Sequence, residues 1–197
     1  MDSVAGKTVL ITGAAMGLGK LFASKAIEQG AAVVVLWDVN EPALMETVEE
    51  LQGAGSVVHG YVVDVSSPEA IATTAALVRE EAGTVEVLFN NAGIVQDAQF
   101  RKMTDDQFDR VIAVNLKGVY NVTKAVVDIM IEQNSGCILN ASSIVGIYGN
   151  FGQTNYATAK AAIVGLTLTL NLELSKLGVT ANVIGPGGMT RISGTMR

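Results

Sequence analysis

The sequence contains few of the residues that mark disulfide-rich, metal-binding or membrane proteins. Its 197 residues include one cysteine, one histidine and three prolines. A lone cysteine cannot form an internal disulfide, so we expect a reducing, cytoplasmic location and a buried structural thiol at Cys137. His59 has no Cys or His clustered with it, so we predict an ordinary strand residue and no metal site.

No apolar run approaches the roughly 18 residues that a spanning helix needs, and no signal peptide is visible, so we expect no membrane association.

Positive charge is also scarce. The chain has 13 Lys and Arg residues against 19 Asp and Glu residues, for a formal net charge of -6. A nucleic-acid binder would show a basic face, so we expect no nucleic-acid partner. The acidic residues are scattered through helical stretches, as is typical of a solvated surface.

Short apolar runs such as "AAVVVLW" and "VEVLF" alternate with helical stretches, in a chain whose residues are 49% hydrophobic. Runs of this length suit strands that are buried on both faces of a parallel sheet. The predicted strands are Thr8–Thr12, Ala32–Asp38, Val57–Val63, Val85–Asn90, Gly136–Ala141 and Thr180–Ile184. Helices are predicted near Gly17–Gln29, after Asn40, after Ser67, and over Thr104–Gln133 and Gln153–Leu177. The alternation predicts an α/β fold, a Rossmann-like doubly wound parallel sheet with helices on both faces, as a single domain over 1–197.

The segment "VLITGAAMGLGK" predicts a strand, a glycine-rich turn and a helix. Gly13, Gly17 and Gly19 have the spacing G-x3-G-x-G. Residues without a Cβ let the backbone approach a pyrophosphate, and the helix N-terminus adds free N–H groups and the positive end of its dipole. A plain tight turn is the alternative, because glycine often serves turns.

Asp38 ends the second predicted strand, 19 residues after Gly19. An acid near this spacing can accept hydrogen bonds from the adenosine ribose, and it repels a 2′-phosphate. Neither Met16 nor Trp37 is basic, so we predict NAD rather than NADP. The alternative is that Asp38 caps the next helix. Asp64 ends the third strand and either meets the adenine edge or serves a turn.

Asn115 lies on an apolar helix face, because Val111, Asn115 and Val119 are spaced by four. A buried amide without partners costs roughly 1–3 kcal/mol, so Asn115 must be bonded. It either belongs to an active site or ties down a neighbouring loop, and the residues leave both open. "FNNAG" follows the fourth strand, and its Gly93 allows a close approach of the backbone.

Tyr156 and Lys160 stand at positions i and i+4 of one predicted helix, hence on one face of it. A phenol is a poor base at neutral pH, but a nearby ammonium favours the phenolate, so we expect a lowered Tyr156 pKa. Ser143, at the end of the fifth strand, can offer its hydroxyl to a substrate oxygen. Such a group can move a proton on or off an alcohol or ketone, which beside a dinucleotide points to hydride transfer. Taken alone, a Tyr-x3-Lys pair is more often a solvated helix face.

Together these motifs resemble the classical short-chain dehydrogenase/reductases. The matching segments follow the family's order: "TGAAMGLG" at 12–19, "NNAG" at 90–93, "AVNLKGVY" around Asn115, Ser143, "YATAK" at 156–160 and "GPGG" at 185–188. The resemblance implies a catalytic tetrad of Asn115, Ser143, Tyr156 and Lys160. Tyr156 would act as general acid/base, Ser143 would polarise the substrate oxygen, Lys160 would tune Tyr156 and bind the nicotinamide ribose, and Asn115 would support a relay water. The implied cofactor-binding residues are Gly13, Met16, Gly17, Leu18, Gly19, Asp38, Val39, Asp64, Val65, Asn91, Ala92, Gly93, Tyr156, Lys160, Pro186, Gly187 and Thr190.

The resemblance has two departures. Thr190 appears one position before the place where the family has a threonine near the nicotinamide amide. The chain also stops at "RISGTMR", several tens of residues before family members usually end. We therefore expect the usual last strand, the substrate-covering helices and one oligomer contact to be absent.

Three functional hypotheses follow. The first is an NAD-dependent oxidoreductase acting on a secondary alcohol or ketone. The second is an NADPH-dependent 3-oxoacyl reductase, because "GNFGQTNYATAK" looks like 3-oxoacyl-carrier-protein reductases. The third is a truncated, inactive dinucleotide-binding fragment. The family pairs its helices at 104–133 and 153–177 across a two-fold axis, so we expect a homodimer or homotetramer. The residues expected to line a mostly apolar substrate pocket are Val95, Gln96, Ile144, Tyr148 and Phe151.

Overall fold

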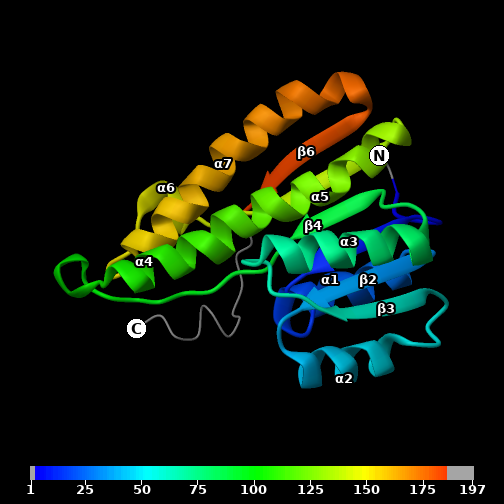
Figure 1. The fold of residues 1–197 in the computed structure, drawn as a ribbon, viewed down its shortest axis with the longest axis horizontal. Helices are drawn as coiled ribbons and strands as arrows, with labels where there is room; N and C mark the ends of the chain where they lie inside the picture. Colours follow the sequence, from blue (N-terminus) through cyan, green and yellow to red (C-terminus); the bar gives the residue numbers. More distant parts are fainter. Residues whose placement is uncertain (1–2, 186–197) are drawn as a thin grey trace.

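The computed structural model describes residues 3–185, and within them the predicted doubly wound sheet is confirmed (Figure 1). Six parallel strands pair in the order β3-β2-β1-β4-β5-β6. Every predicted strand is present, with ends that shift by at most two residues. The strands are β1 (Thr8–Thr12), β2 (Val33–Asp38), β3 (Val57–Val62), β4 (Val87–Asn90), β5 (Gly136–Ala141) and β6 (Val179–Ile184).

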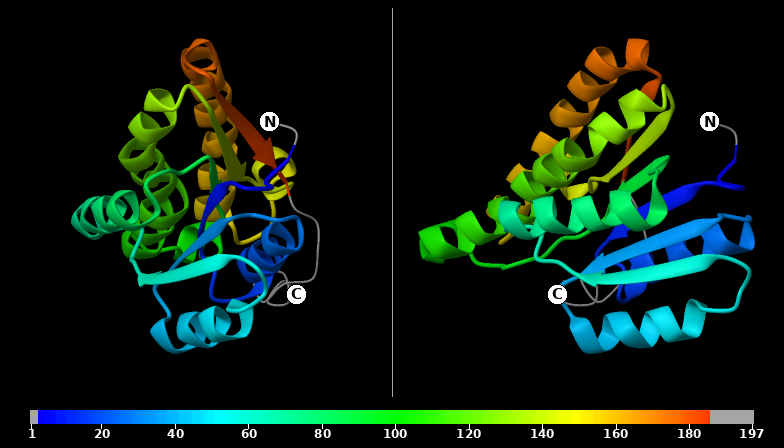
Figure 2. Two further views of the ribbon diagram at one scale, coloured as in Figure 1. Left: turned by 90° about the vertical axis from the view of Figure 1, so that its right-hand side faces the viewer. Right: turned by 45° about the vertical axis from the view of Figure 1, so that its right-hand side comes forward.

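Helices cover both faces of the sheet, as Figures 1 and 2 show. The helices are α1 (Gly17–Glu28), α2 (Glu41–Leu51), α3 (Pro68–Ala82), α4 (Asp105–Ile112), α5 (Val119–Glu132), α6 (Val145–Tyr148) and α7 (Thr154–Leu174), with 3-10 turns at Phe100–Lys102 and Ser175–Leu177. One buried cluster joins α1 and α2 to one face of the sheet, and another joins α3, α5 and the end of α7 to the other face. None of these helices is long and apolar enough to cross a bilayer, as far as residues 3–185 show.

Local sequence signals set where the helices begin. The Asn40 side chain accepts a hydrogen bond from the Ala43 N–H, and Ser67 does the same for Ala70. Thr104 and Gln107 form a reciprocal capping box at the start of α4. Each cap satisfies a backbone donor that the first helical turn leaves without an intrahelical partner, so these three predicted starts are confirmed.

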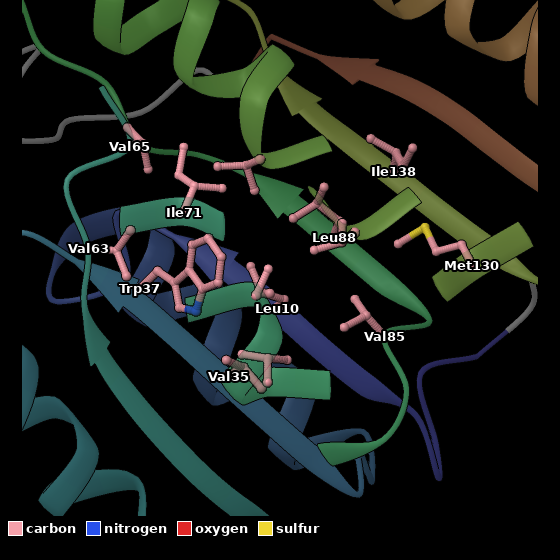
Figure 3. Close-up of a cluster of buried hydrophobic side chains, with 14 of the residues drawn as sticks. Leu10, Val35, Trp37, Val63, Val65, Ile71, Val85, Leu88, Met130 and Ile138 are labelled. Atoms are coloured by element: carbon pink, nitrogen blue, oxygen red, sulfur yellow. The ribbon is translucent and has the colours of Figure 1, made fainter. Parts of the chain in front are cut away.

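The core explains why the strands are apolar throughout. Leu10, Trp37 and Leu88 are fully buried on the face shown in Figure 3, where they meet side chains of α3 and α5. On the other face Leu36 packs in the cluster that contains α1 and α2. Successive residues of β2 thus enter opposite layers, and a strand between two layers needs apolar side chains on both faces.

Two expectations are corrected by the fold. Residues 104–133 do not form one regular helix, because a π-helical segment, Ala113–Gly118, separates α4 from α5. A π turn contains one more residue than an α turn, and the apolar residues of the sequence continue on both sides of it. The helical periodicity of the sequence therefore does not reveal it. Cys137 is only partly buried, so the expectation of a buried thiol is wrong, and the Asn182 Nδ2 on β6 lies 3.7 Å from its Sγ.

Candidate active site

The carboxyl ends of β1 and β4 are joined where the strand order reverses. The Thr12 hydroxyl accepts hydrogen bonds from the N–H groups of Asn91 and Ala92, both at 3.1 Å. The Asn91 amide donates to the carbonyls of Thr12 and Gly13 at 3.1 and 3.0 Å. In open α/β sheets this reversal is where ligands bind. Thr12 was not among the predicted site residues, although its place at the end of β1 could have suggested it.

The glycine-rich turn after β1 is built by close contacts between backbones. Gly13 has φ +65°, and a Cβ there would lie 2.8 Å from the Ala92 Cα atom. A Cβ on Gly19 would lie 2.1 Å from the Gly13 carbonyl oxygen. Met16, at the N-cap of α1, makes no side-chain hydrogen bond to the first turn within the described residues. Uncapped N–H groups beside a cradle that any Cβ would fill suit an anionic group such as a pyrophosphate.

A cavity of about 600 Å³ opens at this edge of the sheet. Most of the predicted cofactor residues line it: Gly13, Met16, Gly17, Leu18, Asp38, Val39, Asp64, Val65, Asn91, Ala92 and Gly93. Residues not predicted as cofactor contacts complete the wall: Trp37, Val63, Ser66, Ile94, Val95, Gln96, Arg110, Ala113 and Val114. The volume and the glycine cradle fit part of a dinucleotide. Of the other predicted cofactor residues, Gly19 lies buried behind the turn, and Tyr156 and Lys160 do not line the cavity. Pro186, Gly187 and Thr190 fall outside the described residues.

Asp38 supports the glycine-rich turn as well as lining the cavity. One carboxylate oxygen accepts a hydrogen bond from the Ala15 N–H and the other from the Asn40 N–H, both at 2.9 Å. The alternative that Asp38 caps the next helix is wrong, because Asn40 does so. Asp64 serves the predicted turn, because its Oδ1 accepts hydrogen bonds from the Ser66 N–H and hydroxyl. It also lines the cavity, and its contact with an adenine edge stays a prediction.

Asn115 is fully buried, and its side chain is bonded to the loop after β4. Its Oδ1 accepts from the Ile94 N–H at 2.8 Å, and its Nδ2 donates to the Ile94 carbonyl at 2.9 Å. The alternative in which Asn115 ties down a neighbouring loop is therefore confirmed. The same loop places Gly93 beside the predicted tetrad: a Cβ there would lie 3.4 Å from Asn115 Oδ1 and 3.7 Å from Lys160 Nζ.

Tyr156 lies in the first turn of α7, where it is 7% exposed. Burial raises the pKa of the phenol, a hydrogen bond with Ser143 lowers it, and the charge of Asp97 raises it, with a net result above the ordinary value. The expectation that Lys160 lowers the pKa of Tyr156 below its ordinary value is therefore wrong. Loss of hydration is the largest cause of the raised pKa, because the phenolate is the charged form that burial disfavours.

Lys160 follows one turn later and is 4% exposed. Its Nζ donates to the Ala141 carbonyl at 2.7 Å and lies 5.6 Å from the centre of the Tyr156 ring. Burial lowers the pKa of this ammonium to about 8. Tyr156 and Lys160 are thus a buried pair rather than a solvated helix face, with Ser143 contributed by the end of β5.

The predicted substrate-pocket residues divide into two groups. Val95 and Gln96 line the cavity. Ile144, Tyr148 and Phe151 are instead 65%, 81% and 82% exposed around α6. Within residues 3–185 no described segment covers these three side chains, so the described part of the chain does not form a pocket around them.

The structure adds polar residues that the sequence did not single out. The fully buried Gln153 donates from Nε2 to both Asp97 carboxylate oxygens at 3.1 Å. Asn155 donates to the carbonyls of Gln96 and Gln107. These two side chains tie the start of α7 to the loop after β4. Both residues lie within three positions of Tyr156 in the sequence, and this nearness was the signal that could have identified them.

Comparisons with known proteins agree with this geometry. The family model described as short chain dehydrogenase matches residues 7–195. A 3-oxoacyl-[acyl-carrier-protein] reductase of Thermotoga maritima is 44% identical over 182 residues, which cover 92% of this chain and 74% of that protein. The peroxisomal hydratase-dehydrogenase-epimerase of Saccharomyces cerevisiae is 40% identical over 198 residues, which cover 100% of this chain and 21% of that protein. Among solved structures, NAD+-bound xylitol dehydrogenase is 36% identical with a TM-score of 0.91, covering 95% of this chain and 73% of that one.

Proposed function

This chain belongs to the short-chain dehydrogenases, a family of oxidoreductases that act on CH-OH groups, and we propose that it is a cytoplasmic NAD-dependent enzyme for a secondary alcohol or ketone. The observation that carries the proposal is the arrangement of Tyr156, which lies one helical turn from the buried Lys160 and near Ser143, whose hydroxyl lowers the pKa of the phenol. Within this group, Lys160 Nζ lies near Gly93, which lines the cavity that fits a dinucleotide.

Tyr156 is proposed to be the general acid/base. In reduction the phenol donates its proton to the developing alkoxide oxygen, and in oxidation the phenolate takes that proton from the alcohol. Ser143 donates a hydrogen bond to the same oxygen and so stabilises its charge. A nicotinamide, when bound, supplies or accepts the hydride. Lys160 holds a positive charge beneath the site and favours the phenolate when Tyr156 loses its proton.

The pKa directions support reduction near neutral pH. A phenol with a raised pKa keeps its proton and can deliver it to a ketone. Oxidation needs the phenolate, so its rate should rise with pH over a range where reduction falls. The proposal therefore includes a difference in pH dependence between the two directions.

Asp38 supports NAD as the cofactor. Its carboxylate lines the cavity and is held by the backbone of Ala15 and Asn40. A fixed negative charge there disfavours a 2′-phosphate. The second candidate is an NADPH-dependent 3-oxoacyl reductase, favoured by the 44% identity with a protein of that name and by Arg110, a cation in the cavity wall.

The decisive experiment uses the single tryptophan, Trp37, which lies in the cavity wall. Its emission is titrated with NADH and with NADPH, and ketones, including a 3-oxoacyl thioester, are then added to the same samples. Tighter NADH binding with ketone-dependent oxidation supports the lead proposal. Preference for NADPH together with turnover of the thioester supports the second candidate instead. Binding without turnover across the panel contradicts both.

An oligomer remains part of the proposal. On α7, Leu168 and Leu172 are 60% and 77% exposed, and Tyr120 on α5 is 48% exposed. Large apolar side chains on adjacent helices are typical of surfaces that pair with another subunit. A homodimer or homotetramer joined through these helices would bury them.

A further inference from the structure

A buried amide holds a carboxylate near the proposed acid/base. Gln153 is fully buried immediately before α7, and its Nε2 donates to both oxygens of Asp97 at 3.1 Å. Its Oε1 accepts a hydrogen bond from Asn150 Nδ2 at 3.0 Å. Both polar ends of the Gln153 side chain are therefore used, so its rotamer is fixed from two sides. The position of the Asp97 carboxylate follows from that of the amide.

The surrounding backbone fixes Asp97 and Tyr156 relative to each other. The Ala98 N–H donates to the Gly152 carbonyl at 2.8 Å, and Asn155 donates to the Gln96 carbonyl at 3.0 Å. Bonds on both sides of Asp97 thus reach the residues just before Tyr156. Because the loop and the helix start are joined at three successive residues, one cannot move without the other.

Three ionisable or polar groups face Tyr156 from the elements packed around it. Lys160 comes from its own helix, Ser143 from the end of β5, and Asp97 from the loop after β4. Asp97 is the one whose charge opposes loss of the phenol proton. As a residue Asp97 is exposed, so water and salt screen its charge and its effect must be moderate.

We propose that Asp97 and Gln153 are positioning residues for Tyr156: Gln153 holds the Asp97 carboxylate against the start of α7, where its charge retains the phenol proton until a substrate oxygen takes it. This inference rests on the proposed function, in which Tyr156 delivers that proton. It assigns the bond between Asp97 and Gln153 a role in setting the pH range of the reaction, beyond joining a loop to a helix.

The first test measures ionisation of Tyr156 without turnover. Phenolate absorbance is titrated against pH in the wild type and in Asp97→Asn, and subtraction of Tyr156→Phe isolates the Tyr156 signal. Asp97→Asn keeps an oxygen to accept from Gln153 but removes the charge. The Tyr156 midpoint should fall by roughly half a pH unit, as for a screened charge. Added salt should lower the midpoint in the wild type and leave that of Asp97→Asn nearly unchanged.

The matched control is Asp109→Asn, which makes the same change of charge at an exposed position of α4. Its Tyr156 midpoint should equal that of the wild type. Gln153→Leu should lower the midpoint in the same direction but by less than Asp97→Asn, because the charge remains but is no longer held. Equal midpoints in the wild type and Asp97→Asn would overturn the proposal.

Kinetics separate this inference from the proposed function. If the enzyme reduces ketones, the pH at which reduction falls off should move down in Asp97→Asn by the same amount as the phenol titration. A shifted titration without any turnover would overturn the proposed function but not the charge effect.

If Asp97→Asn fails to fold, NMR of wild-type protein carrying 13C-labelled tyrosine replaces it. The Tyr156 midpoint should then fall as salt is added, and a midpoint that salt does not move would overturn the inference.

Discussion

Asn115 and Ile94 are bonded to each other twice, through the Ile94 N–H to Asn115 Oδ1 at 2.8 Å and through Asn115 Nδ2 to the Ile94 carbonyl at 2.9 Å. This amide pairing imitates the hydrogen bonding of a neighbouring strand at a place where the chain has left the sheet. It fixes the loop that carries Gly93 against the π-helical segment Ala113–Gly118. The geometry of the proposed site therefore depends on a bond that is formed away from the reacting atoms.

Asn115→Leu should lower the free energy of unfolding by about 2–4 kcal/mol, because two partly buried backbone groups of Ile94 would lose their hydrogen-bond partner. Denaturant unfolding measures the change, and amide exchange should quicken at Ile94. Asn121→Leu on α5 serves as control, since the Asn121 side chain makes no hydrogen bond within residues 3–185. A loss equal to that of the control would contradict the role assigned to Asn115.

Lys160→Met should stabilise the fold while abolishing turnover. The lysine pKa falls from 10.5 to about 8 through burial, a difference worth about 3 kcal/mol at neutral pH. Loss of the bond to Ala141 offsets part of this, so we expect a net gain of about 1–2 kcal/mol in denaturant unfolding.

The same lysine makes stability depend on pH with a defined sign. Between pH about 8 and 10.5 the folded state binds fewer protons at Lys160 than the unfolded state does. The free energy of unfolding should therefore rise with pH across this window in the wild type relative to Lys160→Met. Parallel stability curves for the two proteins would refute the buried, depressed lysine.

Tyr156→Phe should reduce kcat by about 10²–10⁴-fold, the usual contribution of a general acid/base. Affinity for NADH, measured through Trp37 emission, should stay within about twofold, because the ring remains. Tyr148→Phe is the matched control, since Tyr148 is 81% exposed and should keep wild-type turnover. Retained activity in Tyr156→Phe would refute the proposed mechanism.

Asp38→Asn should raise NADPH affinity relative to NADH by about tenfold, equivalent to ~1.4 kcal/mol. The amide keeps an oxygen that can accept from the Ala15 N–H, so the glycine-rich turn is retained while the repulsive charge is lost. Trp37 emission titrations with both nucleotides give the ratio. An unchanged ratio would show that Asp38 does not select the cofactor.

Leu172→Glu should weaken self-association if α7 lies in a subunit interface. Light scattering at micromolar concentration should show a dimer or larger species for the wild type and a smaller one for the variant. Leu77→Glu on α3, where Leu77 is 40% exposed, introduces the same charge on another helix and should leave the mass unchanged. A monomeric wild type would refute the oligomer proposal.

Much of the fold and some of the candidate site could be read from the sequence because these features depend on neighbouring residues. Apolar runs marked the strands, Asn40 and Ser67 marked helix starts through their own side chains, and helical spacing placed Tyr156 and Lys160 on one face. The glycine spacing likewise predicted a tight turn whose backbones come into contact. Each of these signals acts over a few residues, where periodicity and turn chemistry are strong.

Only the tertiary structure decided what the site residues contact. Asp38 bonds Ala15 across 23 residues, Asn115 bonds Ile94 across 21, and Gln153 bonds Asp97 across 56. The sequence predicted a lowered Tyr156 pKa, and the structure gives a raised one for the same reason. The spacing of Tyr156 and Lys160 shows that an amine is near. Burial and the charge of Asp97 depend instead on what the whole chain packs around the phenol. Hydration and long-range hydrogen bonds belong to the folded arrangement, so local sequence determined which groups are available and the packing determined how they behave.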